Sequence, residues 1–125
     1  MSCILIVEDN YATRTALSTL LRDEGYPVEC AANGQEALLR MNGGLSPCLI
    51  LLDLVMPCMD GWQFCEELAR DPKRAAIPFV LLSGVHEVGE SKLGRAAVAV
   101  FPKPVDFDAL LATVARYCES AAPAA

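Results

Sequence analysis

A short apolar run that ends in an acidic residue constrains the fold of this chain more than any other feature. The run Cys48–Leu52 is wholly apolar and is followed at once by Asp53, after which Pro57 and Gly61 interrupt the pattern. It is too short for a typical helix, and its Ile and Leu content is typical of a strand that is buried on both faces. We therefore expect a parallel sheet that is covered by helices on both sides.

The rest of the chain alternates between strand-like and helix-like segments. Strands are predicted over Cys3–Asp9, Pro27–Ala31, Ile77–Leu82 and Ala97–Phe101, and helices over Tyr11–Glu24, Asn33–Met41, Asp60–Arg70, His86–Arg95 and Phe107–Cys118. Asn33 and Asp106 stand where helix-capping residues are favoured. Five strands alternating with five helices predict an α/β fold, a flavodoxin-like, doubly wound parallel sheet of order 2-1-3-4-5.

Length and charge restrict the class of protein. The 125 residues fit one domain, predicted over residues 1–119, and the short Ala/Pro tail 120–125 is expected to be disordered. No apolar run reaches membrane-spanning length and the N-terminus lacks a signal-peptide pattern, so we expect a soluble, cytoplasmic protein. The net charge of −6 argues against sequence-independent binding of nucleic acid or anionic lipid.

The six cysteines do not show a metal-binding or disulfide pattern. Most of them lie inside apolar strand-like or helix-like segments, and none forms a C-x-x-C pair. We predict that they are buried, reduced thiols that behave as small hydrophobic residues, and that zinc is not bound. Cys58 is the exception, because it lies in a predicted loop close to Asp53 and could be reactive.

Polar residues gather where the predicted strands end. Glu8 and Asp9 end the first strand, Asp53 ends the third, Ser83 follows the fourth and Lys103 follows the fifth. Parallel strands bring their carboxyl ends to one edge of the sheet, which is where α/β proteins bind ligands. Carboxylates that lie close together repel one another unless a cation intervenes, and Mg²⁺ prefers oxygen ligands of this kind.

This set of side chains suits phosphoryl transfer. Asp53 would be the nucleophile and would form an aspartyl phosphate. Mg²⁺ and Lys103 would each hold a phosphoryl oxygen, and the Ser83 hydroxyl could donate to a third. The nearby acids, one divalent ion and one lysine come close to electrical neutrality, so a phosphoryl group would meet no net repulsion.

At this point the chain resembles a known family, the response-regulator receiver domain of two-component signal transduction, in the CheY-like superfamily. The resemblance extends from Ile4 to about Cys118. It depends on four motifs in order, which are Glu8-Asp9, Asp53–Gly61, Ser83-Gly84 and Lys103-Pro104. Each motif is weak by itself, whereas all four at receiver-like spacings are specific.

The resemblance implies a mechanism and partners. Asp53 would be phosphorylated by the phosphohistidine of a sensor histidine kinase or of a histidine phosphotransfer protein. Mg²⁺ would be held by Asp9, Asp53 and the backbone carbonyl of Val55, with Glu8 acting through water, and the bond before Pro104 is expected to be cis. The protein would not be an enzyme beyond its own phosphorylation and slow dephosphorylation.

Output is expected through contacts with a downstream protein and not through direct contact with nucleic acid or a membrane. The resemblance places those contacts on the face formed by the predicted helix His86–Arg95, the strand Ala97–Phe101 and the last helix. The chain could act as a phosphate shuttle, as a diffusible regulator or as a piece of a longer protein.

One residue departs from the family pattern and leaves alternatives open. Val100 stands where receivers usually carry an aromatic switch residue, which makes a phosphorylation-independent interaction module the main alternative. A small hydrolase is a further alternative, but Val55 stands where its general acid would be needed. In a purely structural interpretation, Asp53 and Ser83 are loop residues and Lys103 is a solvated surface lysine.

Overall fold

The computed structural model describes residues 3–53, 61–83 and 97–119, and its centre is a parallel sheet of order β2-β1-β3-β4-β5. The strands are β1 Cys3–Val7, β2 Val28–Ala31, β3 Pro47–Asp53, β4 Phe79–Ser83 and β5 Ala99–Pro102. The helices are α1 Tyr11–Asp23, α2 Gly34–Asn42, α3 Gly61–Ala69, the single turn α4 Pro72–Ala75, and α6 Phe107–Tyr117. The predicted fold class and strand order are confirmed.

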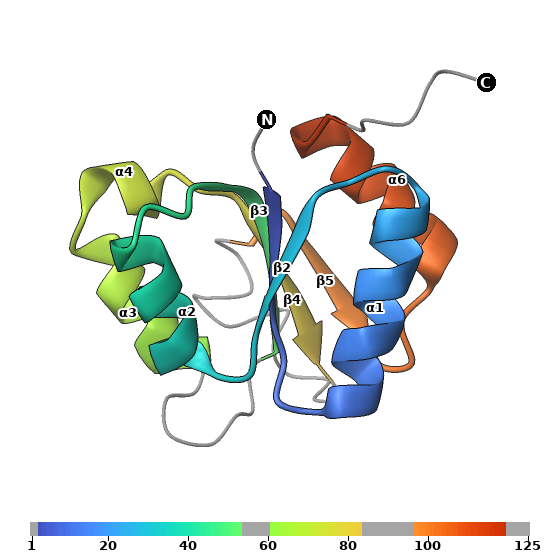
Figure 1. Ribbon diagram of the computed structural model, residues 1–125, viewed down its shortest axis with the longest axis horizontal. Helices are drawn as coiled ribbons and strands as arrows, with labels where there is room; N and C mark the ends of the chain where they lie inside the picture. Colours follow the sequence, from blue (N-terminus) through green and yellow to red (C-terminus); the bar gives the residue numbers. More distant parts are fainter. Residues whose placement is uncertain (1–2, 54–60, 84–96, 120–125) are drawn as a thin grey trace.

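Helices cover the two faces of the sheet (Figure 1), with α1 and α6 on one face and α2, α3 and α4 on the other. Each face buries its own apolar cluster. Leu51 of β3 packs in the cluster that includes residues of α1 and α6, whereas its neighbour Leu52 packs with Phe64 of α3. This two-sided burial explains why the β3 sequence is continuously apolar and does not alternate with polar residues.

Capping side chains explain where three of the helices begin. Asn10, Asn33 and Asp106 each accept a hydrogen bond from a backbone N–H three residues further on, at 2.9, 2.8 and 3.2 Å respectively. These bonds satisfy donors that have no partner inside the helix. The caps predicted at Asn33 and Asp106 are therefore confirmed.

The segment after α3 differs from the prediction. The sequence indicated that Asp71 and Pro72 simply close α3, but they begin the additional turn α4. Asp71 accepts a hydrogen bond from the N–H of Lys73 at 2.9 Å, and proline is favoured in the first helical turn because it needs no N–H partner there. The helix predicted over His86–Arg95 and the tail 120–125 lie outside the described residues.

The cysteine prediction is wrong for one pair, because Cys48 of β3 and Cys118 at the end of α6 form a disulfide. Their Cα atoms are 5.7 Å apart, although 70 residues separate them in the sequence. Cys3, Cys30 and Cys65 are free, as predicted, but they are only partly buried, and Cys58 lies outside the described residues. None of the described helices is both long enough and apolar enough to span a bilayer.

Candidate functional site

Strand register brings the predicted site residues to one edge of the sheet. Val7 pairs with Leu52, so Glu8 and Asp9 follow β1 at the level where β3 ends in Asp53. On the other side Ser83 pairs with Pro102, the residue before Lys103. The ends of four strands therefore lie along one edge of the sheet.

Three carboxylates come together at this edge, those of Glu8, Asp9 and Asp53. Each offers an oxygen atom, and these oxygens all lie within 4.8 Å of one another. Glu8 is fully buried and Asp53 is 5% exposed, whereas Asp9 is exposed. A compact set of oxygen donors on two neighbouring strands fits a hard divalent ion such as Mg²⁺.

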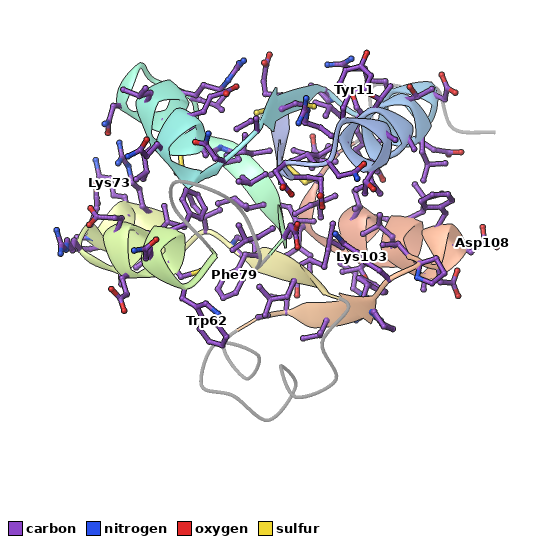
Figure 2. All side chains as sticks on the ribbon, turned by 90° about the horizontal axis from the view of Figure 1, so that it is seen from below. Tyr11, Trp62, Lys73, Phe79, Lys103 and Asp108 are labelled. Carbon is purple, nitrogen blue, oxygen red and sulfur yellow. A yellow bond between two sulfur atoms is a disulfide. The ribbon has the colours of Figure 1, made fainter. Side chains whose placement is uncertain are left out.

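Lys103, the residue that follows β5, joins the acidic cluster. Its Nζ lies 3.2 Å from Glu8 Oε2 and 3.4 Å from Asp53 Oδ2. Figure 2 looks onto this edge and shows Lys103 beside the start of α6, with Trp62 on the side of α3. Partial burial lowers the pKa of Lys103, but the charges of Asp53 and Glu8 outweigh that effect and leave its pKa raised. The lysine is therefore held as a cation beside two carboxylates, although 32% of its side chain is exposed.

Glu8 is held through both of its carboxylate oxygens. Oε1 accepts a hydrogen bond from the N–H of Asn10 at 3.1 Å, and Oε2 accepts one from Lys103. Burial raises the pKa of Glu8, the Asn10 bond opposes that rise, and the nearby Asp53 charge adds to it. Because both oxygens already have partners, this side chain fits a role beside a metal ion better than direct ligation.

Sequence reasoning missed Arg14, which supports the loop that carries the acids. Its Nη1 donates to the carbonyl oxygens of Glu8 at 2.8 Å and Asp9 at 3.4 Å, and its guanidinium lies 5.6 Å from the centre of the Tyr11 ring. No role was predicted for Arg14 from the sequence. Its position in the first helical turn, directly after an acidic pair, is the signal that could have suggested this contact.

Two other predicted site residues, Ser83 and Val55, have different outcomes. Ser83 is the last residue of β4, and its backbone is aligned with the site, while the role of its hydroxyl stays a prediction. Val55, whose carbonyl the resemblance assigns to the metal, lies outside the described residues. Val100 is partly buried against the cluster that contains Phe64, and the bond between Lys103 and Pro104 is cis as expected.

The chain belongs to the response regulator receiver domain family, whose model matches residues 4–115. It is thus a receiver domain of the kind found in two-component response regulators, proteins in which such domains interact with histidine kinases or phosphotransfer proteins. Residues 4–115 include Glu8, Asp9, Asp53, Ser83 and Lys103.

Two curated relatives illustrate different contexts of this domain. The probable transcriptional regulator ycf27 of Pyropia yezoensis is 35% identical over 118 residues, which cover 90% of this chain and 47% of the relative. Protein PilH of Pseudomonas aeruginosa is 32% identical over 118 residues, which cover 91% of this chain and 95% of PilH. The chain therefore spans about half the length of ycf27 and nearly all of PilH.

A solved structure supports the same fold. Response regulator protein TrrA from Thermotoga maritima, crystallised in complex with Mg(2+)-BeF, superimposes with a TM-score of 0.82 at 30% identity. The alignment covers 94% of this chain and all of TrrA.

Proposed function

We propose that this chain accepts a phosphoryl group on Asp53 in a Mg²⁺-dependent reaction and passes the signal on through protein contacts. The observation that carries the proposal is the contact of Lys103 with Asp53 at 3.4 Å inside a cluster of three carboxylates. A nucleophilic carboxylate, a fixed cation and a set of metal-binding oxygens are the parts that phosphoryl transfer to an aspartate needs.

Each residue of the site has a role in this proposal. Asp53 attacks the phosphorus of a donor phosphohistidine, so that an O–P bond forms as the N–P bond to the imidazole breaks. The Lys103 ammonium and the Ser83 hydroxyl each hold a phosphoryl oxygen. Mg²⁺, when bound, neutralises developing charge on the phosphoryl oxygens. Asp9, Asp53 and the Val55 carbonyl would hold it, with Glu8 acting through water.

A groove beside the site suits the approach of a donor protein. It has a volume of about 370 Å³ and lies between α1 and the segment that leads into α6, with Lys103 in its wall. Phe107, which lines the groove, is 43% exposed. A sensor kinase or a phosphotransfer protein must cover surface next to Lys103 to reach Asp53, and apolar contacts in this groove would hold it there.

The remaining assignments complete the proposal. Residues 1–119 form the receiver domain, and the protein acts in the cytoplasm. Its output passes to a downstream protein partly through β5 and α6, and the acidic chain makes no direct contact with nucleic acid or with a membrane. It is not an enzyme, apart from catalysing its own phosphorylation and slow dephosphorylation.

The intact mass of the chain after incubation with acetyl phosphate and Mg²⁺ tests the proposal. We expect a gain of one phosphoryl group that maps to Asp53 and is absent without the metal. Asp53→Asn should abolish the gain, whereas Asp23→Asn, a change of an exposed acid at the end of α1, should not. Labelling of Asp53→Asn at the rate of the parent chain would contradict the assignment.

The donor groove needs a separate experiment. Phe107→Ala should slow phosphorylation by a phosphohistidine protein several-fold but leave phosphorylation by acetyl phosphate unchanged, because the small donor needs no docking surface. Tyr117→Ala is the matched control, since this aromatic residue lies at the other end of α6 and is 40% exposed. If Phe107→Ala slowed phosphorylation equally with both donors, Phe107 would support the folding of the site and not the docking of a donor protein.

Val100 favours a second candidate function, a phosphorylation-independent interaction module. In the described structure this partly buried aliphatic side chain occupies the position that the family resemblance gives to an aromatic switch residue. Beryllofluoride with Mg²⁺ distinguishes the two functions. A change in the NMR spectrum that spreads from the site to β5 supports the receiver, and an unchanged spectrum supports the module.

A further inference from the structure

The Cys48–Cys118 disulfide links the start of β3 to the end of α6, two elements that are far apart in the sequence. Asp53 ends the same strand, five residues after Cys48, which places the disulfide roughly 17 Å from the acidic site. The central strand therefore carries the acidic site at one end and a covalent link at the other.

An irregularity in β3 explains how Cys48 reaches α6. The β1–β3 pairing passes from Cys3–Pro47 directly to Ile4–Leu49, so the register shifts by one residue at Cys48. A shift of this kind changes the direction of a side chain. Cys48 packs against the same cluster as Leu49, the cluster of α1 and α6, although strict alternation would place the two side chains on opposite faces.

The last turn of α6 depends on this link. Leu110 and Val114 are fully buried and fix the middle of the helix, but the next three residues, Ala115, Arg116 and Tyr117, are exposed. Cys118 is then 8% exposed, and its N–H donates to the Val114 carbonyl at 3.0 Å. Among the described residues after Val114, Cys118 is thus the one buried contact that holds the helix end to the sheet.

We propose that Cys48 and Cys118 form a reversible thiol–disulfide switch that fixes the end of α6 to the sheet when oxidised and releases it when reduced. This inference rests on the cytoplasmic location in the proposed function, because disulfides that persist in reducing compartments are rare and those that form there usually cycle between the two states. The switch does not depend on phosphorylation of Asp53, because its parts and its expected effects lie at the opposite end of β3.

The chemistry balances with a small disulfide such as oxidised glutathione as the oxidant. The partly exposed Cys48 thiol loses its proton, and its thiolate attacks the glutathione disulfide and displaces one glutathione thiolate. The Cys118 thiolate then attacks Cys48 Sγ in the mixed disulfide and displaces the second glutathione. Two cysteine thiols are oxidised, one glutathione disulfide is reduced to two thiols, and the two protons pass to the departing thiolates.

The surroundings of Cys65 explain why this cysteine makes a suitable control. It lies on α3, on the other face of the sheet, and burial raises its pKa to about 12. A thiol with such a pKa remains protonated near neutral pH and is a poor nucleophile. The free Cys3 is closer, since its carbonyl oxygen lies 3.3 Å from Cys48 Sγ, but burial raises the pKa of its thiol as well.

The test uses the full chain equilibrated in glutathione buffers of graded redox potential, then quenched with acid, alkylated and mapped by mass spectrometry. We expect a linked Cys48–Cys118 peptide in oxidising buffer and two alkylated cysteines in reducing buffer. Oxidation should raise the melting temperature by roughly 10 °C, because the link closes a long loop in the unfolded chain. Amide exchange over residues 115–119 should slow by about tenfold.

Variants separate the switch from a general effect of oxidation. Cys118→Ser and Cys48→Ser should each behave like the reduced parent chain in every buffer, and Cys65→Ser should retain the redox response. The proposal is overturned if oxidising buffer gives no Cys48–Cys118 peptide. It is also overturned if exchange over residues 115–119 is the same in both states or if Cys118→Ser still shows the response.

Discussion

Lys103 and Glu8 form an ion pair across the edge of the sheet, with 3.2 Å between Nζ and Oε2, although 95 residues separate them in the sequence. The same ammonium lies 3.4 Å from Asp53 Oδ2, so one cation is paired with two buried carboxylates. Burying a carboxylate without a partner is costly, and the lysine offsets that cost before any metal ion arrives.

Replacing this lysine should therefore weaken the fold as well as the chemistry. In Lys103→Ala, Glu8 and Asp53 face each other without a cation, and we expect a loss of about 1–3 kcal/mol in the free energy of unfolding without metal. Urea denaturation measures this loss, and Lys73→Ala on the short helix α4 is the control. Some labelling of Asp53 by acetyl phosphate should remain, but it should no longer change the structure around β5. An unchanged stability would show that the observed contact carries no net energy.

The raised pKa of Glu8 predicts a dependence of stability on pH. Its folded-state pKa lies above the ordinary value of 4.5, so the folded chain binds this proton more tightly than the unfolded chain. Proton binding by Glu8 therefore stabilises the folded chain fully below pH 4.5, and this contribution to the free energy of unfolding is lost as the pH rises through the folded-state pKa. Glu8→Gln should remove the part of the fall in stability with rising pH that comes from Glu8. Melting temperatures of the two metal-free chains between pH 4.5 and 8 test this, and parallel curves would contradict it.

Arg14 should influence metal binding without touching the metal. It holds the carbonyl groups of Glu8 and Asp9, so Arg14→Ala should loosen the acidic loop and weaken Mg²⁺ binding by about tenfold. Isothermal titration with Mg²⁺ measures the affinity directly. Arg22→Ala is a close control, because Arg22 also extends from α1 to a backbone carbonyl, that of Val28 at 3.0 Å, but far from the acids. An equal loss of Mg²⁺ affinity in both variants would indicate a general effect on α1.

The core between the sheet and α3 should be sensitive to the loss of volume at Phe64. This side chain is fully buried, and Phe64→Ala should reduce the free energy of unfolding by about 3–5 kcal/mol. Leu39 on α2 is 71% exposed, so Leu39→Ala should change the free energy of unfolding by less than about 0.5 kcal/mol. Chemical denaturation of both variants checks the contrast, and similar losses would mean that the assignment of the core is wrong.

The fold and most of the site could be predicted because they depend on local patterns. A few neighbouring residues are enough to recognise an apolar strand that ends in Asp9 or Asp53, or a capping residue such as Asn33. The parallel arrangement then brings the strand ends together without further information. The meeting of Asp53 with Lys103 follows from this general property of the fold and from the family resemblance.

The disulfide and the role of Arg14 could not be predicted, because each depends on the direction of a side chain in three dimensions. A shift of one residue in the β1–β3 register turns Cys48 toward α6, and nothing in the sequence marks that shift. Arg14 lies on a helix surface, where most charged side chains point into water. The hydrogen bond from Arg14 to the Glu8 carbonyl oxygen can be recognised only once the positions of α1 and β1 are known.

The distribution of the site over distant strands has a consequence during synthesis. Glu8 follows the first strand, Asp53 ends the third and Lys103 follows the fifth, so no contiguous fragment shorter than residues 8–103 contains all of them. A nascent chain that has just left the ribosome as far as β4 carries the acids without their ammonium partner. A complete cluster of Glu8, Asp53 and Lys103 therefore marks a chain whose translation has passed the last strand.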